Sequence, residues 1–242
     1  VFSRSAHDAR TYANLYGVPH WYTDAQSMIE NPNVNAIYIA TPPSAHAAYA
    51  IMAMRAGKTC LIEKPLASSY EDCVRINRVA EQTGVPCFVA YYRRYLPYFR
   101  TVRDILRRGV IGKVLSIQIR FAVPANELDN DGNKDDRPWR LQPQEDGRGY
   151  FYNLAPHQFD LLQYLFGIIV KAHGYTANRT GHYKVEDTVN AVFRFEDGLC
   201  GSGSWSFAAH ESAKEDSMEI YGTEGRIRFT TTNRLRFTPA KA

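Results

Sequence analysis

The feature that most constrains the fold is a regular alternation of short apolar runs and helical segments in the first part of the chain. The apolar runs have the length of strands, and they are residues 35–41, 59–63 and 85–92. The helical segments that precede or separate them are residues 5–17, 44–57 and 69–83. Because strands that alternate with helices pair in parallel, this order predicts a doubly wound α/β sheet. The first run is uninterrupted, which is typical of a strand buried on both faces.

Residues that cap helices mark the predicted helix ends. Ser5 and Gly17 bound the first helix, and Ser44 and Gly57 bound the second. Ser69 precedes the third. A serine side chain accepts a hydrogen bond from the first turn of a helix, and glycine readily adopts the left-handed backbone that ends one.

The pattern changes near Pro97. A helix is predicted at 97–108, a strand at 113–121, a long polar segment at 124–149 and an apolar helix at 150–167. Strand patterns joined by short glycine-containing turns follow, at 187–195, 199–207, 217–222 and 226–231. Such turns are typical of antiparallel hairpins. The sequence therefore predicts a parallel-sheet α/β domain over 1–96 and an α+β domain with a large, mainly antiparallel open sheet over 97–242.

Composition narrows the functional classes. The 242 residues are 45% hydrophobic and carry a net charge of +4 without a basic cluster, which does not favour a nucleic-acid partner. No apolar run is long enough to span a membrane. The four cysteines show no paired spacing, and three lie in apolar runs, which indicates free thiols in a reducing compartment and predicts a cytoplasmic protein. The histidines and cysteines never reach a metal-ligand spacing, so no metal site is predicted.

Ser3, Arg4 and Ser5 follow the end of a strand and begin a helix. In a dinucleotide-binding sheet this position meets the adenosine ribose, where a carboxylate favours a free 2′-hydroxyl and an arginine accommodates a 2′-phosphate. The absence of an acid here favours a phosphorylated cofactor. The alternative is an ordinary exposed arginine at a helix start.

Two later strand ends carry further candidate contacts to a ligand. Ala40, Thr41 and Pro42 follow the first apolar run, and ligands of open parallel sheets bind beyond such strand ends. His46 lies in the first turn of the next helix. Either it contacts the ligand or it is an interior histidine bonded to its own protein.

Glu63, Lys64 and Pro65 follow the next run. A lysine at this place can hydrogen-bond a substrate hydroxyl and ease its loss of a proton as hydride leaves. The proline is expected to hold the bend through a cis bond.

Two arginines beside aromatic residues are candidates of a weaker kind. Arg94 ends the last parallel segment, and Arg140 follows Trp139 in the long polar segment. Arg94, Trp139 and Arg140 are assigned to the cofactor site, and Arg94 is assigned to the substrate site as well. A role of Arg94 in the contact between domains is equally open.

The helix at 150–167 places Asn153, His157 and Asp160 on one face, because positions four and seven apart stack in a helix. These side chains either are solvated or face a pocket. His157 is able to exchange a proton near neutral pH. The alternative is a core histidine bonded to main chain.

Three segments in this order resemble the glucose–fructose oxidoreductase / inositol dehydrogenase family, Gfo/Idh/MocA. They are residues 16–67 with their "EKP", the segment "GRGYFYNLAPHQFDLLQYLFG" at 147–167, which resembles the family's G-G-G-x-x-x-D-x-G-x-H-x-x-D, and "IYGTEGRI" at 220–227. The resemblance implies a Rossmann-type domain and an open sheet that often mediates oligomer contacts. It also implies an NAD(P)-dependent dehydrogenase or reductase of sugars, cyclitols or related polyols.

By the family's motifs, Lys64 would touch the nicotinamide ribose and the reacting hydroxyl, and His157 would be the general acid/base. Asn153 would orient the substrate, although the family has an aspartate at this position. Pro43 replaces an asparagine of the family. The family's G-x-G-x-x-G loop is not in the sequence, so the resemblance implies a chain that lacks the first βα unit at its N-terminus.

The resulting expectation is an oxidoreductase that uses NADP or NAD, with NADP preferred. Its partner would be a small sugar or polyol, and it would form a homo-oligomer, a dimer or tetramer, through the antiparallel sheet. The alternative is a weakened family member that senses cofactor or sugar as a regulator or scaffold; Asn153 and Pro43 favour it, and the retention of Lys64 and His157 argues against it.

Overall fold

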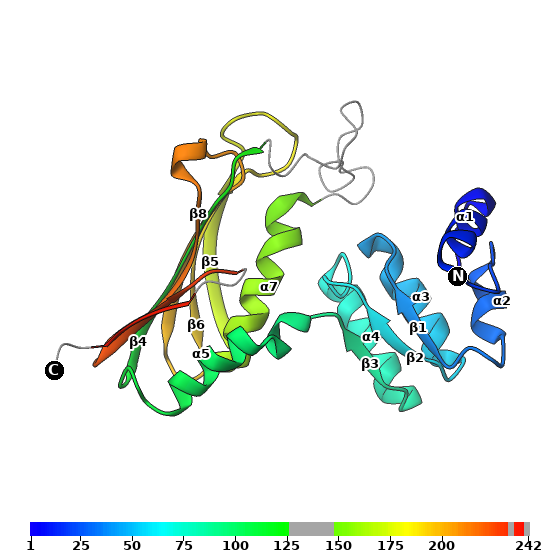
Figure 1. The fold of residues 1–242 in the computed structure, drawn as a ribbon, viewed down its shortest axis with the longest axis horizontal. Coiled ribbons are helices and arrows are strands. Elements are labelled where there is room, and N and C mark those ends of the chain that lie inside the picture. The colour runs from blue at the N-terminus through cyan, green and yellow to red at the C-terminus, as the bar shows by residue number, and fades with distance from the viewer. Residues whose placement is uncertain (126–147, 232–234, 240–242) are drawn as a thin grey trace. The chain divides into compact units, whose positions relative to one another are not determined.

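The computed structural model describes residues 1–125, 148–231 and 235–239. The chain divides into two compact units, Val1–Ala90 and Tyr91–Ala242, called here the first and second units (Figure 1). The short 3-10 helix η1 (Tyr92–Tyr95) falls in the second unit, and the domain boundary after residue 96 stays a prediction.

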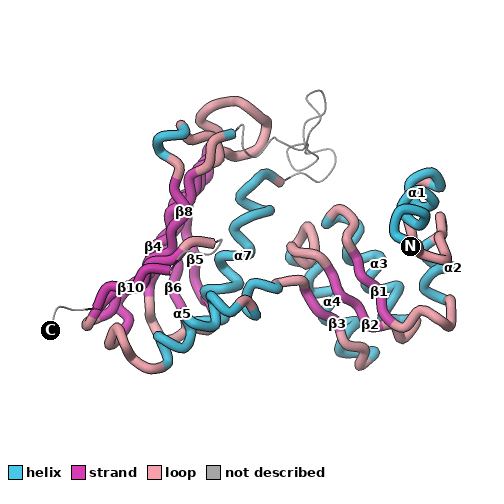
Figure 2. Tube along the Cα trace, viewed as in Figure 1, coloured by secondary structure: helices cyan, strands magenta, loops and turns pink. Residues whose placement is uncertain are grey.

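The first unit contains a parallel sheet flanked by helices. Within the described residues its strands pair in the order β1-β2-β3, and they are β1 (Ala36–Ile39), β2 (Thr59–Ile62) and β3 (Cys87–Val89). The helices are α1 (Ala6–Tyr16), α2 (Ala25–Glu30), α3 (Pro43–Arg55) and α4 (Tyr70–Thr83), and Figure 2 shows α3 and α4 beside the strands. The predicted strand–helix alternation is confirmed.

Most predicted caps of the first unit are confirmed. Ser5 accepts a hydrogen bond from the amide of Asp8, and Ser69 caps α4 in the same way. Gly17 ends α1 with a φ of 64°. The prediction that Ser44 caps the second helix is wrong, because α3 begins at Pro43, whose fixed φ suits the first helical position and which needs no amide partner there.

One face of this sheet differs from the prediction. The strand at 35–41 was expected to be buried on both faces, yet β1 alternates between buried and exposed positions. Tyr38, Leu61 and Phe88 are register partners across the three strands and are 58%, 40% and 56% exposed. The helices that follow β1 and β2 bury the other face of the sheet, where Ile37, Ile39 and Ile62 belong to the core of the unit.

The second unit is built on a large sheet. Within the described residues its strand order is β10-β9-β8-β4-β7-β6-β5, antiparallel except for β4 beside β7. The strands are β4 (Val114–Ala122), β5 (Ile169–Ala177), β6 (Thr188–Phe195), β7 (Cys200–Ser206), β8 (Glu215–Gly222), β9 (Gly225–Phe229) and β10 (Leu235–Pro239). The helices are α5 (Pro97–Arg107) and α7 (Gly149–Phe166), with the short η4 (Glu211–Ala213).

The predicted α+β architecture is confirmed, but two edge strands were not predicted. β5 is exposed along nearly its whole length, so its sequence lacks the apolar alternation that identifies a strand. β10 has five residues and pairs with β9 alone. An edge strand with one neighbour and little burial leaves a weak sequence signal.

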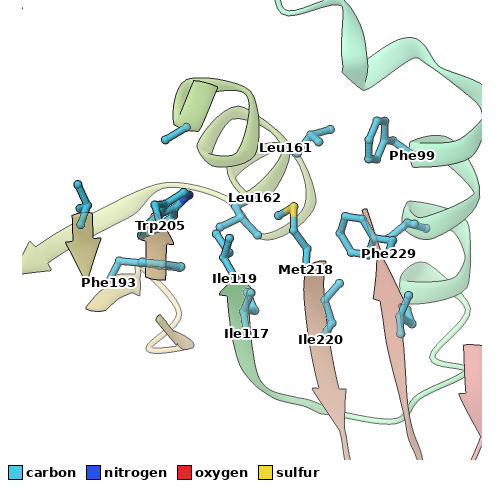
Figure 3. Close-up of a cluster of buried hydrophobic side chains, with 14 of the residues drawn as sticks. Phe99, Ile117, Ile119, Leu161, Leu162, Phe193, Trp205, Met218, Ile220 and Phe229 are labelled. Carbon is cyan, nitrogen blue, oxygen red and sulfur yellow. The ribbon is translucent and has the colours of Figure 1, made fainter. Parts of the chain in front are cut away.

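The core of the second unit lies between the sheet and the two helices α5 and α7 (Figure 3). Phe99 of α5 and Leu162 of α7 join side chains from the sheet, among them Ile119, Met218 and Phe229. These side chains are almost completely buried, so hydrophobic transfer fixes α7 against the sheet.

Two glycines of β7 determine where the largest rings of this core lie. A Cβ atom added at Gly203 would collide with the ring of Trp205, and one added at Gly201 would collide with Phe193, its partner across the strand pair. Both glycine positions are buried. Each aromatic ring therefore fills the space above a residue that has no side chain.

The opposite face of this sheet carries mainly polar side chains, with Val192 as an exposed apolar one. Alternation along the strands places Gln118, Arg120, Val192 and Ser202 there, and all but the half-buried Ser202 are exposed. Two adjoining hollows of about 410 and 500 Å³ lie over β4 to β7 on this face.

Candidate active site

The turn after β2 contains Glu63, Lys64 and Pro65, all half-buried. The carboxylate of Glu63 accepts hydrogen bonds from the hydroxyl of Tyr38 at 2.6 Å and from the amide of Lys64 at 3.1 Å. The bond between Lys64 and Pro65 is cis, as predicted. The hydrogen bond to Glu63 is the main reason that the pKa of Tyr38 is raised to about 12, so this phenol stays neutral.

The end of β1 lies beside this turn, since the amide of Glu63 donates to the carbonyl of Ile39. Ala40 and Pro42 are exposed, and Thr41 between them is half-buried. The hydroxyl oxygen of Thr41 is buried and has no hydrogen-bond partner among the described residues. A buried hydroxyl without a partner is rare in folded proteins, so Thr41 has the capacity to bond a ligand at this strand end.

His46 is 1% exposed and lies between these two strand ends. Its Nε2 is 2.8 Å from the carbonyl oxygen of Thr41, and its Nδ1 is 3.0 Å from that of Pro65. Both ring nitrogens thus have main-chain partners. This geometry favours the alternative of an interior histidine over a direct contact with cofactor.

The segment before α1 contains Ser3, Arg4 and Ser5. Ser3 lines the same cavity as residues of β1. The hydroxyl of Ser3 accepts from the amide of Ser5, whose own hydroxyl caps α1, and Arg4 is exposed. A cavity of about 550 Å³ extends from Ser3 along β1, and Arg4 and Ser5 are not part of its lining. Its lining includes Ser3, Ala9, Tyr38, Ala40, Thr41 and Tyr49.

In the second unit, α7 holds His157 in a buried position. His157 is 5% exposed, and the rings of Tyr91 and Tyr92 stand edge-on to its imidazole, with centroids 6.2 and 5.8 Å away. Asp160 is 6% exposed, and Asn153 is half-buried. The alternative of a solvated helix face does not describe these residues.

Arg94 pairs with the carboxylate that follows His157 on the helix. Its Nε donates to both carboxylate oxygens of Asp160 at 2.9 Å, and its guanidinium lies 5.6 Å from the ring of Tyr164. The hydrogen bond to Asp160 raises the pKa of Arg94. This pair joins η1, which carries Tyr92, to α7, which carries His157. The predicted contact of Arg94 with cofactor or substrate stays a prediction.

The two tyrosines beside His157 were not identified from sequence. Tyr91 and Tyr92 follow the last parallel strand, but nothing in the segment itself indicates which residue of a distant helix they meet. The pairing of Tyr38 with Glu63 was missed for the same reason, since 25 residues separate them.

Trp139 and Arg140 lie outside the described residues. Within the described ranges, His, Cys, Asp and Glu side chains form no group of three that would hold a metal ion. The helices that the structure describes are too short or too polar to cross a lipid bilayer. All four cysteines are free thiols, of which Cys60 is buried and Cys200 exposed.

Known proteins resemble the chain along nearly its whole length. Oxidoreductase P35 of Formosa agariphila is 35% identical over 232 residues, which are 95% of this chain and 70% of that protein. The scyllo-inositol 2-dehydrogenase (NAD(+)) of Bacillus subtilis is 27% identical over 90% of this chain and 62% of its own length. A levoglucosan dehydrogenase solved with NADH and levoglucosan superposes with a TM-score of 0.86 at 27% identity, covering 100% of this chain and 66% of that one.

The chain thus spans about two thirds of the length of these relatives, which are oxidoreductases and include dehydrogenases of a cyclitol and a sugar derivative. The two units match two family models in order. Residues 1–91 match the oxidoreductase family with an NAD-binding Rossmann fold, and residues 99–228 match the GFO/IDH/MocA C-terminal domain. The predicted family and fold are confirmed: the chain belongs to the Gfo/Idh/MocA family of NAD-binding oxidoreductases.

Proposed function

We propose that this protein is an NAD(P)-dependent oxidoreductase that interconverts a secondary hydroxyl of a sugar, cyclitol or related polyol and the corresponding ketone. Membership of the family supports the reaction class. The observation that carries the proposal to this chain is the buried imidazole of His157 on α7, which contacts the rings of Tyr91 and Tyr92. A general acid/base needs such a fixed and partly desolvated position.

In this proposal His157 takes the proton of the substrate hydroxyl as the carbon–hydrogen bond breaks and the carbonyl forms, and it returns that proton in the reverse direction. Lys64 donates a hydrogen bond to the same oxygen and stabilises the negative charge that develops on it. Asn153 orients a neighbouring hydroxyl through its amide. A bound nicotinamide supplies the acceptor or donor of the hydride.

The residues of the first unit fit such a cofactor. The partnerless hydroxyl of Thr41 supplies a donor beside a cavity of about 550 Å³. We assign Ala40, Thr41 and Pro42 to one wall of the cofactor site, together with the turn Glu63–Lys64–Pro65. His46 would support this wall from behind. Contacts from Arg94, Trp139 and Arg140 belong to the same proposal.

The test is a panel of polyols and sugars with NAD and NADP on the full-length protein, followed by His157→Ala and Lys64→Ala on the best substrate. Each variant is expected to lower kcat by about 10² to 10⁴. His182→Ala is the matched control, because His182 is exposed in the loop between β5 and β6 of the same unit. Unchanged turnover in His157→Ala would refute the assigned role.

A double variant tests whether Lys64 and His157 serve one step. Residues that act as a unit have strongly non-additive effects. We expect Lys64→Ala with His157→Ala to lose little more than the worse single variant. Full additivity would place the two residues in separate steps.

We propose a preference for NADP, supported by the exposed Arg4, which lies between Ser3 and Ser5 immediately before α1. Arg4→Ala should weaken NADP binding more than NAD binding in a fluorescence titration. Arg10→Ala, exposed on the same helix, is the control. Equal affinity of the unaltered protein for NAD and NADP would remove the preference.

The regulator alternative is not favoured, since the relatives are dehydrogenases and this chain keeps both Lys64 and His157. It would require cofactor or sugar binding with no hydride transfer to any member of the panel.

We further propose a homo-oligomer, a dimer or tetramer, through the open face of the large sheet, and a cytoplasmic location. Exposed Val192 and Tyr175 on that face support the contact, and the free thiols support the location. Val192→Arg should reduce the mass measured by analytical ultracentrifugation, whereas an unchanged mass would exclude this face. A fluorescent fusion of the full-length protein tests the location.

A further inference from the structure

His46 contacts the main chain on both sides of its ring. Nε2 lies 2.8 Å from the carbonyl oxygen of Thr41, and Nδ1 lies 3.0 Å from that of Pro65 and 3.3 Å from that of Leu66. The ring therefore connects the end of β1 with the segment that follows Lys64. At 1% exposure, water does not replace these contacts.

The number of protons on the ring decides which of these contacts are hydrogen bonds. A carbonyl oxygen only accepts hydrogen bonds, whereas a neutral imidazole has a single N–H and a lone pair on its other nitrogen. With one proton, either Nε2 or Nδ1 would direct its lone pair at an oxygen. Both contacts are hydrogen bonds only when both nitrogens carry hydrogen, which is the imidazolium form.

The elements around His46 carry further ionisable groups, among them Tyr49 on α3 and Glu71, Asp72 and Arg75 on α4. Tyr38, Cys60 and Cys73 are neutral near pH 7, because a hydrogen bond to Glu63 raises the pKa of the phenol to about 12 and burial raises the pKa of both thiols. The charged groups next to the same turn are Glu63 and Lys64, of opposite sign. Three carbonyl dipoles thus provide the direct stabilisation of a charge on the ring.

We propose that His46 is a positioning residue which, with both ring nitrogens protonated, fixes the main chain that carries Lys64 against the end of β1. The inference rests on the proposed function only in that Lys64 touches the reacting hydroxyl there. The loss of one proton releases the carbonyl of Thr41 or the pair at Pro65 and Leu66. The ring then no longer connects the end of β1 with the segment that follows Lys64.

The primary test is NMR spectroscopy of the full chain labelled with ¹⁵N-histidine. Long-range proton–nitrogen spectra separate protonated from unprotonated ring nitrogens, and His46→Gln identifies the signal by its loss. At pH 6 we expect both nitrogens of His46 in the protonated range. A lone-pair nitrogen at pH 6 would overturn the proposal.

The second measurement follows the backbone amides of Lys64 and Leu66 in the unaltered protein as pH is raised. We expect their shifts to change over the same pH interval in which the His46 ring loses a proton. In His46→Gln that step should vanish, while His7→Gln, exposed on α1, should retain it. A ring that titrates while both amides stay fixed would show that the ring does not position the turn.

These readouts need neither substrate nor turnover. Failure of His157→Ala to slow the enzyme would refute the proposed function and leave the His46 spectra as they are. A neutral His46 would refute the positioning role and leave the His157 result intact.

Discussion

The two units hold their candidate catalytic residues by different means. In the first unit the Lys64 turn is fixed largely through main-chain atoms, since His46 meets three carbonyl groups and Glu63 accepts from the amide of Lys64. In the second unit His157 of α7 contacts side chains, namely the rings of Tyr91 and Tyr92, and the pair of Arg94 with Asp160 joins η1 to the same helix. Main-chain partners exist in any sequence, whereas side-chain partners depend on particular residues. Substitutions among the neighbours should therefore affect the second site more.

The largest effect is expected from Trp205→Ala in the second unit. Its indole is fully buried, packs against Phe151 and Phe159 of α7, and donates to the side chain of Gln158. Truncation of a buried tryptophan costs about 3–5 kcal/mol. Urea unfolding followed by circular dichroism measures the loss. Trp21→Ala, 43% exposed in the first unit, should cost far less, and equal losses would contradict the account of this core.

The pair of Arg94 and Asp160 predicts that removal of one partner destabilises the protein more than removal of the other. Arg94→Ala leaves a carboxylate that is 5% exposed without its partner, and we expect a loss of about 2–3 kcal/mol. Asp160→Asn leaves a guanidinium that is 38% exposed and can be hydrated, so its cost should be about 1 kcal/mol. Chemical denaturation of both variants checks the order. The reverse order would mean that the pair does not hold η1 against α7.

The stability of the protein at low pH tests the role of Asp187, whose buried carboxylate lies in the loop between β5 and β6. Burial alone would raise its pKa, but hydrogen bonds from Arg179, Thr180 and Thr188 outweigh burial and lower the pKa below its ordinary 3.8. A depressed pKa contributes stability that is complete above pH 3.8 and is lost as pH falls through the folded-state value.

Asp187→Asn should therefore cost about 1–2 kcal/mol at neutral pH, and the difference from the unaltered protein should shrink in acid. Denaturation at several pH values measures this. Asp104→Asn, on a side chain that is 63% exposed, is the control. A constant difference down to acidic pH would contradict the assignment.

The smallest effect is expected from Asn153→Asp. A carboxylate on the same helix face would stabilise the charged form of His157 and move the pH–rate profile toward higher pH, with a change in kcat of less than about tenfold. Gln163→Glu, exposed on the same helix, should leave the profile unchanged. An unshifted profile in Asn153→Asp would separate this position from the proton transfer.

Local chemistry explains which parts of the structure were predictable. Ser5, Gly17 and Ser69 act on residues three to five positions away, so sequence alone identifies them as caps. Short apolar runs and the alternation of apolar and polar residues likewise predict most strands of both sheets. Ser44 misled because the proline before it already satisfies the requirements of a helix start.

The candidate residues were identified only from patterns within their own segments, Lys64 from its place after β2 and His157 from the polar face of α7. The partners Tyr38 and Glu63 are 25 residues apart, and Arg94 and Asp160 are 66 apart. The tertiary fold determines these contacts. His46 shows the limit most clearly, because its position at a helix start suggested a ligand contact, whereas the fold surrounds it with carbonyl groups.

The glycines beneath the aromatic rings of β7 impose an order on the evolution of the second unit. A methyl group at Gly203 is incompatible with the indole of Trp205, while a smaller side chain at 205 would leave the site at 203 open. A lineage can therefore acquire a side chain at position 203 only after the tryptophan has been replaced. The same dependence links Gly201 to Phe193, so the mutational history of this sheet is expected to contain paired changes in a fixed sequence.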